Sequence, residues 1–179
     1  MYIFQKGQVC DLKTRELTEL LEMLDQKLSS LILESNKSED PDALGLYDRA
    51  EYFIGIGFVA MQQYIADTMF NSKVSKKNAL NLGNKSPKGI PYIAIINFAA
   101  NWWKHEAEWD WFGEGEIDQQ TFKDVLNVSG SVEYPLSNIL SHLCAENELS
   151  LSLVIPKLES WRDEFIKYRQ NQCNNNQYT

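Results

Sequence analysis

Leucines recur at three- and four-residue steps near the start of the chain, and this spacing restricts the fold more than any other feature. The series consists of Leu17, Leu20, Leu21, Leu24, Leu28, Leu31 and Ile32. Positions three and four apart share one face of an α-helix, whereas a strand needs alternation every second residue. The pattern therefore predicts a helix over residues 12–34, with one apolar face that another element must cover.

Further helical patterns follow at about 42–70, 91–109, 118–128, 135–146 and 151–170. The middle of the first of these is apolar all round, which indicates a central position. It contains Gly55 and Gly57, each of which costs about 1 kcal/mol in a helix relative to Ala. We expect a neighbouring helix to approach closely there; a short strand is the alternative interpretation.

These patterns predict an all-α protein, built as an antiparallel helical bundle with a C-terminal helical extension. Residues 1–115 form the expected bundle, 116–170 the extension packed on it, and 171–179 a polar tail that we expect to fray. Only residues 1–9 or 128–134 are candidates for pairing as strands. Asp40 followed by Pro41 has the residue types of a helix start, so the second helix is expected to begin there.

Composition and charge narrow the class of protein. The 179 residues are 44% hydrophobic, enough for one full core, and the net charge of −8 disfavours a protein that coats duplex DNA. The longest apolar run, 53–61, is far shorter than the roughly 20 residues of a membrane span. The three cysteines are far apart, and no secretory signal pattern opens the chain. We expect a cytoplasmic protein without membrane association, cofactor or metal.

One segment between the second and third predicted helices, 71–89, is basic. It holds five lysines and no acid: Lys73, Lys76, Lys77, Lys85 and Lys88. A solvated loop is one interpretation. The other is a contact surface for a nucleic-acid phosphate backbone or for an acidic protein partner.

The third predicted helix carries a polar stripe among apolar residues. Asn97, Asn101 and His105 are each four residues apart and line one face, and Lys104 and Glu108 lie on the adjoining stripe. Buried polar groups need partners, so one explanation is a polar network that fixes helix register or a dimer seam. The other is an active site, in which a histidine transfers protons near neutral pH.

The run Ala100-Asn-Trp-Trp-Lys-His105 resembles the Arg-Asn-x-x-x-His signature of HEPN proteins. The resemblance covers about residues 12–110. It implies a four-helix bundle and metal-independent RNA cleavage at a dimer interface. In that reaction the histidine assists proton transfer at the 2′-hydroxyl, and the arginine stabilises the phosphate. It also implies a place in a prokaryotic toxin–antitoxin or phage-defence system.

The chain departs from that signature at the arginine, because Ala100 takes its place. Alanine cannot stabilise a pentavalent phosphate, so only His105 and Asn101 match. Lys104 or Arg49 could supply the missing cation, Lys104 as a point charge instead of a bidentate fork. We therefore expect His105, Asn101, Lys104 and Arg49 to form the catalytic set of a homodimeric endoribonuclease.

The missing arginine, the net negative charge and the acidic turn after the third helix support a second hypothesis. Under it the chain is a non-catalytic acidic interaction protein, such as an antitoxin, immunity protein or inhibitor, that binds a protein partner. The position of His105 distinguishes the two. An enzyme needs it in a solvent-reachable cleft beside a cation, whereas an interaction protein can bury it in a satisfied network.

Overall fold

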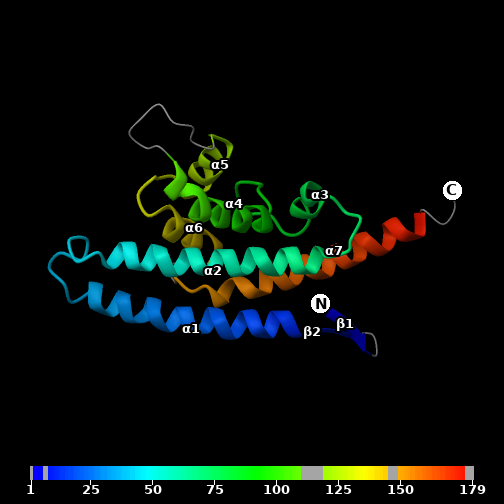
Figure 1. The fold of residues 1–179 in the computed structure, drawn as a ribbon, viewed down its shortest axis with the longest axis horizontal. Coiled ribbons are helices and arrows are strands. Elements are labelled where there is room, and N and C mark those ends of the chain that lie inside the picture. Colours follow the sequence, from blue (N-terminus) through cyan, green and yellow to red (C-terminus); the bar gives the residue numbers. More distant parts are fainter. Residues whose placement is uncertain (1, 6–7, 110–118, 145–148, 176–179) are drawn as a thin grey trace.

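The computed structural model describes residues 2–5, 8–109, 119–144 and 149–175, and most of them are helical (Figure 1). The long helices are α1 (Leu12–Ser35), α2 (Leu46–Met69), α4 (Tyr92–His105) and α7 (Ile155–Asn175). The shorter ones are α3 (Lys76–Leu80), α5 (Gln119–Ser129) and α6 (Pro135–Leu143), with 3-10 turns η1 (Glu106–Glu108) and η2 (Ser152–Val154). The prediction of an all-α bundle is confirmed.

Helix α2 lies at the centre of the arrangement. It packs against α1 on one side and α4 on the other, and the chain runs in alternating directions through the three helices (Figure 1). α7 contacts α1, α2 and α4, while α5 and α6 cover α4 and the first half of α2. Among the described residues no helix is both long and apolar enough to span a bilayer.

The leucine face of α1 forms one wall of the core. Its inward positions are all buried: Leu17, Leu21, Leu24, Leu28 and Leu31. Burying one leucine contributes about 1.5–3 kcal/mol, so this face alone explains why α1 docks on the bundle. Trp102 of α4 and Trp161 of α7 are the largest fully buried side chains. Trp102 packs on Trp109 and on Phe122 of α5, and Trp161 donates to the Ala79 carbonyl of α3.

Both glycines of α2 are sites of close approach, but only Gly55 meets the neighbouring helix that was predicted. A Cβ at Gly55 would lie 1.8 Å from Cδ1 of Trp103, so α4 passes against the bare backbone of α2. A Cβ at Gly57 would lie 2.6 Å from Cδ1 of Leu151, a residue just before η2. Both positions are helical, so the alternative of a short strand was wrong.

The N-terminal residues form a small hairpin. β1 (Tyr2–Gln5) pairs with β2 (Gln8–Asp11) in antiparallel register, with Tyr2 opposite Asp11. The other candidate for strand pairing, 128–134, instead ends α5 and continues as bends. The hairpin leads directly into α1, because Asp11 is the N-cap of that helix and accepts from the Lys13 and Thr14 amides.

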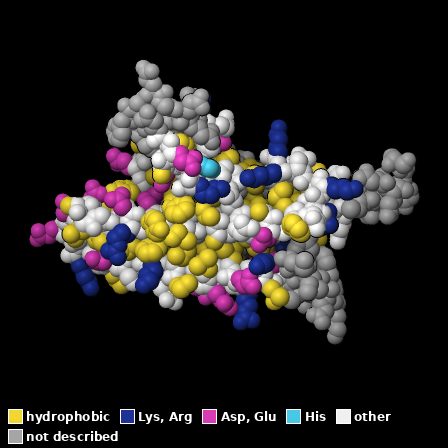
Figure 2. Space-filling model, viewed as in Figure 1, with side chains coloured by type: hydrophobic (Ala, Val, Ile, Leu, Met, Phe, Trp, Pro, Cys, Tyr) yellow, Lys and Arg dark blue, Asp and Glu magenta, His cyan; other side chains and the backbone are white. Residues whose placement is uncertain are grey.

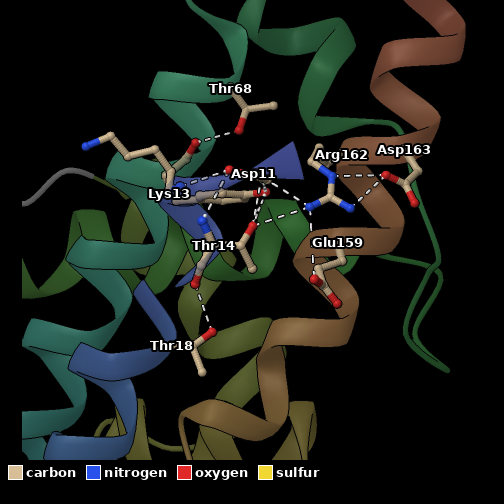
Figure 3. A network of polar contacts seen from close by, with 9 residues as sticks. Asp11, Lys13, Thr14, Thr18, Thr68, Glu159, Arg162 and Asp163 are labelled. Atoms are coloured by element: carbon tan, nitrogen blue, oxygen red, sulfur yellow. Dashed lines mark hydrogen bonds and ion pairs between the residues drawn. The ribbon is translucent and has the colours of Figure 1, made fainter. Parts of the chain in front are cut away.

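Asp11 also anchors a buried polar network that joins the hairpin, α1, α2 and α7 (Figure 3). Its Oδ2 accepts a 2.7 Å bond from the Tyr64 hydroxyl of α2 and a 3.1 Å bond from Arg162 Nη1 of α7. Burial acts to raise the pKa of Asp11, but the hydrogen bonds from Tyr64, Thr14 and Arg162 outweigh it and lower that pKa. Burial raises the pKa of Tyr64 to about 12.

Several predicted boundaries differ from the structure. α4 ends at His105 instead of 109, and α7 begins at Ile155 instead of 151. α2 begins at Leu46, after Gly45 with a φ of +63°, whereas Asp40 caps only the preceding turn by accepting from the Ala43 amide. Within 71–89 the short helix α3 replaces part of the expected loop. α7 continues to Asn175, so residues 171–175, which we expected to fray as part of the polar tail, are helical. The proposed division at residues 115 and 116 lies outside the described residues.

Candidate functional site

The polar stripe of α4 meets a single glutamine of α2. Gln62 Nε2 donates to Oδ1 of Asn97 and to Oδ1 of Asn101, both at 2.9 Å. Gln62 Oε1 accepts a 2.7 Å bond from Lys104 Nζ. Both amide donors and the carbonyl are thereby used, which determines the amide orientation. One side chain of α2 thus holds three polar side chains of α4.

This arrangement is the polar network that the spacing predicted as one of two explanations. Asn97 is 6% exposed, so its amide needs the partner that Gln62 provides. Asn101 is half-buried and Lys104 is exposed, so the network runs from the interior to the surface. It orients the Lys104 amine, because one of its three N–H donors is engaged by Gln62.

His105, the last position of the stripe, is separate from that network. Its Nδ1 lies 3.1 Å from Oε2 of Glu108 in η1, and its side chain is 48% exposed at the end of α4. A carboxylate at one ring nitrogen fixes the ring orientation and tautomer and leaves Nε2 to act on a ligand. The imidazole is therefore reachable from solvent, next in sequence to Lys104.

Ala100 faces the interior. Its exposed fraction is 0%, and it belongs to the core cluster around α2 and α4. The position that holds arginine in the HEPN signature therefore points away from solvent in this chain.

Arg49 does not reach the stripe. It forms a 3.9 Å ion pair with Glu34 near the end of α1, and both side chains are more than half exposed. Thirteen residues of α2 separate it from Gln62, about 20 Å at the helical rise. Of the two expected substitutes for the arginine, only Lys104 lies with His105 and Asn101 on α4.

The five lysines of the basic segment have different surroundings, although all are exposed. Lys88 Nζ donates to the carbonyls of Asn127 and Val128 at 2.6 and 3.3 Å, and so caps the C-terminus of α5. Lys76 opens α3 and faces the same hollow as Lys104. Lys73, Lys77 and Lys85 project from the surface. Figure 2 shows Lys and Arg side chains over α3 and α4, next to apolar side chains of α2.

That hollow, here called the basic groove, lies between α2, α3 and α4 and has a volume of about 420 Å³. Its lining consists of Val59, Gln62, Gln63, Ile65, Ala66, Met69, Phe70, Lys76, Asn97 and Lys104. Burial, and second the charge of Lys76, lower the pKa of Lys104. His105 is not part of the lining. Neither Gln62 nor Phe70 was predicted as a site residue from the sequence. The available signal for Gln62 was its position as a polar residue beside an apolar run.

A second hollow of about 350 Å³ lies between α2, η1 and the start of α6, and it is acidic. Asp48, Glu51 and Glu106 line it together with aromatic side chains. Burial raises the pKa of Glu51, which accepts from the Leu136 and Ser137 amides and so caps α6. Burial, and also the charge of Glu51, raise the pKa of Glu106.

Most of the acidic turn after α4 lies in 110–118, outside the described residues. Within the described part of the chain, no three His, Cys, Asp or Glu side chains gather in a way that could hold a metal ion.

Compared with models of known protein families, with curated proteins and with solved structures, the chain shows no match. The HEPN resemblance therefore depends on the six-residue run that ends at His105.

Proposed function

We propose that this protein is a HEPN-like, metal-independent endoribonuclease in which His105 transfers protons. One observation carries the proposal: an exposed imidazole, held at Nδ1 by Glu108, adjoins a lysine that a buried amide network holds in place. The setting that the resemblance implies is a prokaryotic phage-defence or toxin–antitoxin system, with a homodimer as the active form.

The chemistry uses groups that this chain has. His105 Nε2 takes the proton of the RNA 2′-hydroxyl, whose oxygen attacks the adjacent phosphorus. The bond to the 5′ oxygen breaks and leaves a 2′,3′-cyclic phosphate and a 5′-hydroxyl. Glu108 stabilises the imidazolium that forms. In the homodimer, the second copy of His105 protonates the leaving oxygen.

In this proposal Lys104 and Asn101 contact the phosphate in place of the arginine. The Lys104 amine contributes positive charge to the phosphate, as a point charge without the bidentate geometry of a guanidinium. Asn101 accepts from Gln62 through Oδ1, so its amide nitrogen remains as a donor toward a phosphate oxygen. We expect slower cleavage than an arginine would support.

The test is cleavage of a single-stranded RNA in excess EDTA by the wild-type protein and by His105→Ala. His142→Ala is the matched control, because His142 is also exposed but lies on α6. We expect the wild type and His142→Ala to produce 2′,3′-cyclic phosphate ends and His105→Ala to lose at least about 100-fold in rate. Equal rates for all three proteins, or no cleavage by any, would refute the proposal.

A second candidate is the non-catalytic interaction protein, and the burial of Ala100 favours it. Without a cation at that position, the chain is a helical bundle that lacks one member of the HEPN catalytic set. The acidic hollow is then the face for a basic protein partner. Under this candidate no cleavage occurs, and Asp48→Asn weakens binding to a partner protein whereas Asp124→Asn on α5 does not.

A further inference from the structure

The basic groove combines positive charge with an apolar surface. Lys76 and Lys104 contribute two amines, and Gln62 and Asn97 contribute amides. The remaining lining is largely apolar, and Phe70 at the end of α2 is 69% exposed. The exposed ring extends the apolar lining, and a ligand that covers it gains free energy from the buried apolar area. The lining therefore suits a ligand with an anionic group and a flat apolar body.

The charges in the groove lack a counterion within the described residues. Neither Lys76 nor Lys104 forms an ion pair with a described carboxylate, and the charge of Lys76 acts on Lys104. Two like charges in one hollow repel each other, and an anion between them removes that repulsion. Gln62 engages only one N–H of Lys104, so its other donors are free for an anion.

The size and position of the groove limit what it holds. About 420 Å³ lies in the range of sites for single small molecules. Asn97, in the lining, precedes His105 by eight residues of the same helix, about 12 Å. A ligand in the groove therefore lies beside the imidazole and not on it.

We propose that the basic groove binds one nucleotide of a single-stranded RNA, with its phosphate between Lys76 and Lys104 and its base against Phe70. Bases stack on exposed aromatic side chains with little sequence preference. The nucleotide flanks the bond that His105 cleaves. Its identity as part of a substrate depends on the proposed function, whereas the binding itself does not.

The experiment measures fluorescence anisotropy of a labelled single-stranded RNA 12-mer with His105→Ala protein, so that binding is separated from cleavage. Lys76→Ala and Phe70→Ala are compared with Lys77→Ala, a neighbouring exposed lysine outside the lining, and with Leu33→Ala, an exposed apolar residue of α1. We expect Lys76→Ala and Phe70→Ala each to weaken binding at least about fivefold and both controls less than twofold. Because the changed residues are exposed, circular dichroism of all variants should agree.

An abasic strand and small competitors identify the ligand. Phe70→Ala should not change the affinity for the abasic strand, and a nucleoside monophosphate should compete better than inorganic phosphate or decanoate. Equal losses for Lys76→Ala and Lys77→Ala, or an unchanged affinity of Phe70→Ala for the full strand, overturn the proposal. Competition by decanoate as strong as that by the nucleotide overturns it in favour of an acyl anion.

The failures of the two proposals are distinguishable. EDTA-resistant cleavage that persists with unchanged KM in Phe70→Ala and Lys76→Ala proteins overturns the nucleotide site and leaves the ribonuclease proposal standing. Base-dependent binding in the groove without any cleavage overturns the ribonuclease proposal and leaves the nucleotide site standing.

Discussion

At the scale of single residues, Gln62 has the largest influence on the candidate site. It lies on α2, yet it determines how Asn97, Asn101 and Lys104 of α4 are arranged. A side chain with both donors and the acceptor engaged across a helix interface is costly to remove, because each partner then loses its hydrogen bond at once.

Gln62→Leu should therefore destabilise the protein by about 1–3 kcal/mol, since it leaves the buried Asn97 amide without its partner. Urea unfolding measures the change. Gln63→Leu is the control, because Gln63 is exposed and bonds only to Asp67 of its own helix. We expect that control to stay within about 0.5 kcal/mol of wild type. Similar losses for both variants would show that the network contributes nothing.

Ala100→Arg introduces the arginine of the HEPN signature and should not increase the proposed RNA cleavage. The position is fully buried, so a guanidinium there has neither space nor a partner, and we expect a loss of at least about 3 kcal/mol. Thermal unfolding and the EDTA cleavage assay provide the readouts. Ala107→Arg, at an exposed position of η1, should fold like wild type. A stable Ala100→Arg protein with faster cleavage would contradict the inward orientation of Ala100.

At the scale of elements, the Asp11 network connects the hairpin, α1, α2 and α7 (Figure 3). It places one carboxylate at the N-terminus of α1, where the helix dipole also favours negative charge. Arg162 reaches the same carboxylate from the last helix, with a side chain only 9% exposed. The network therefore joins the N-terminal hairpin to α7 through a hydrogen-bonded ion pair.

The lowered pKa of Asp11 predicts an acid-dependent loss of stability. The folded protein holds the Asp11 proton less tightly than the unfolded chain, whose value is near 3.8. This contribution is therefore present above that pH and is lost as the pH falls through the lower folded value. Asp11→Asn should cost about 1–3 kcal/mol at pH 7 and show a shallower decrease of the unfolding free energy below pH 4.

The measurement is urea unfolding at intervals between pH 2 and 7. Asp124→Asn serves as the control, because Asp124 lies on α5 and, among the described residues, its carboxylate bonds only to Gln120. Parallel pH profiles for wild type and Asp11→Asn would exclude Asp11 as a source of the acid sensitivity.

At the scale of the whole molecule, the contact of α2 with α4 determines which residues meet. Trp103 lies against Gly55, and two turns further along α2 the stripe of α4 meets Gln62. The two helices are antiparallel, so a shift of one relative to the other would separate the amide network and open the basic groove. The glycine thus affects a site about 10 Å away along the helix.

Gly55→Ala tests this dependence. Alanine favours helix by about 1 kcal/mol, yet its Cβ would overlap Trp103, so we expect a net destabilisation of about 1–3 kcal/mol and weaker RNA binding. Gly57→Ala is the comparison, because the nearest atoms to its Cβ belong to the end of the Leu151 side chain, at 2.6 Å instead of 1.8 Å, and we expect a smaller loss. A Gly55→Ala protein that is more stable than wild type would show that α4 has room to move.

The sequence by itself determined the longer helices and the inward face of α1, because both follow from the local spacing of apolar residues, whereas it did not predict α3. It also indicated that Gly55 needed a close neighbour and that Asn97, Asn101 and Lys104 needed partners. The start of α2 was predicted one turn too early, since Asp40 and Pro41 suit a turn as well as a helix start.

Only the tertiary structure decided which partners those residues have. Gln62 became the common partner, Arg49 turned toward α1, Ala100 faced the core, and Lys76 joined Lys104 in one groove. These pairings depend on the register and angle at which helices far apart in the chain pack. Periodicity within one helix carries no information about that register, because it reports which face is buried and not what lies opposite.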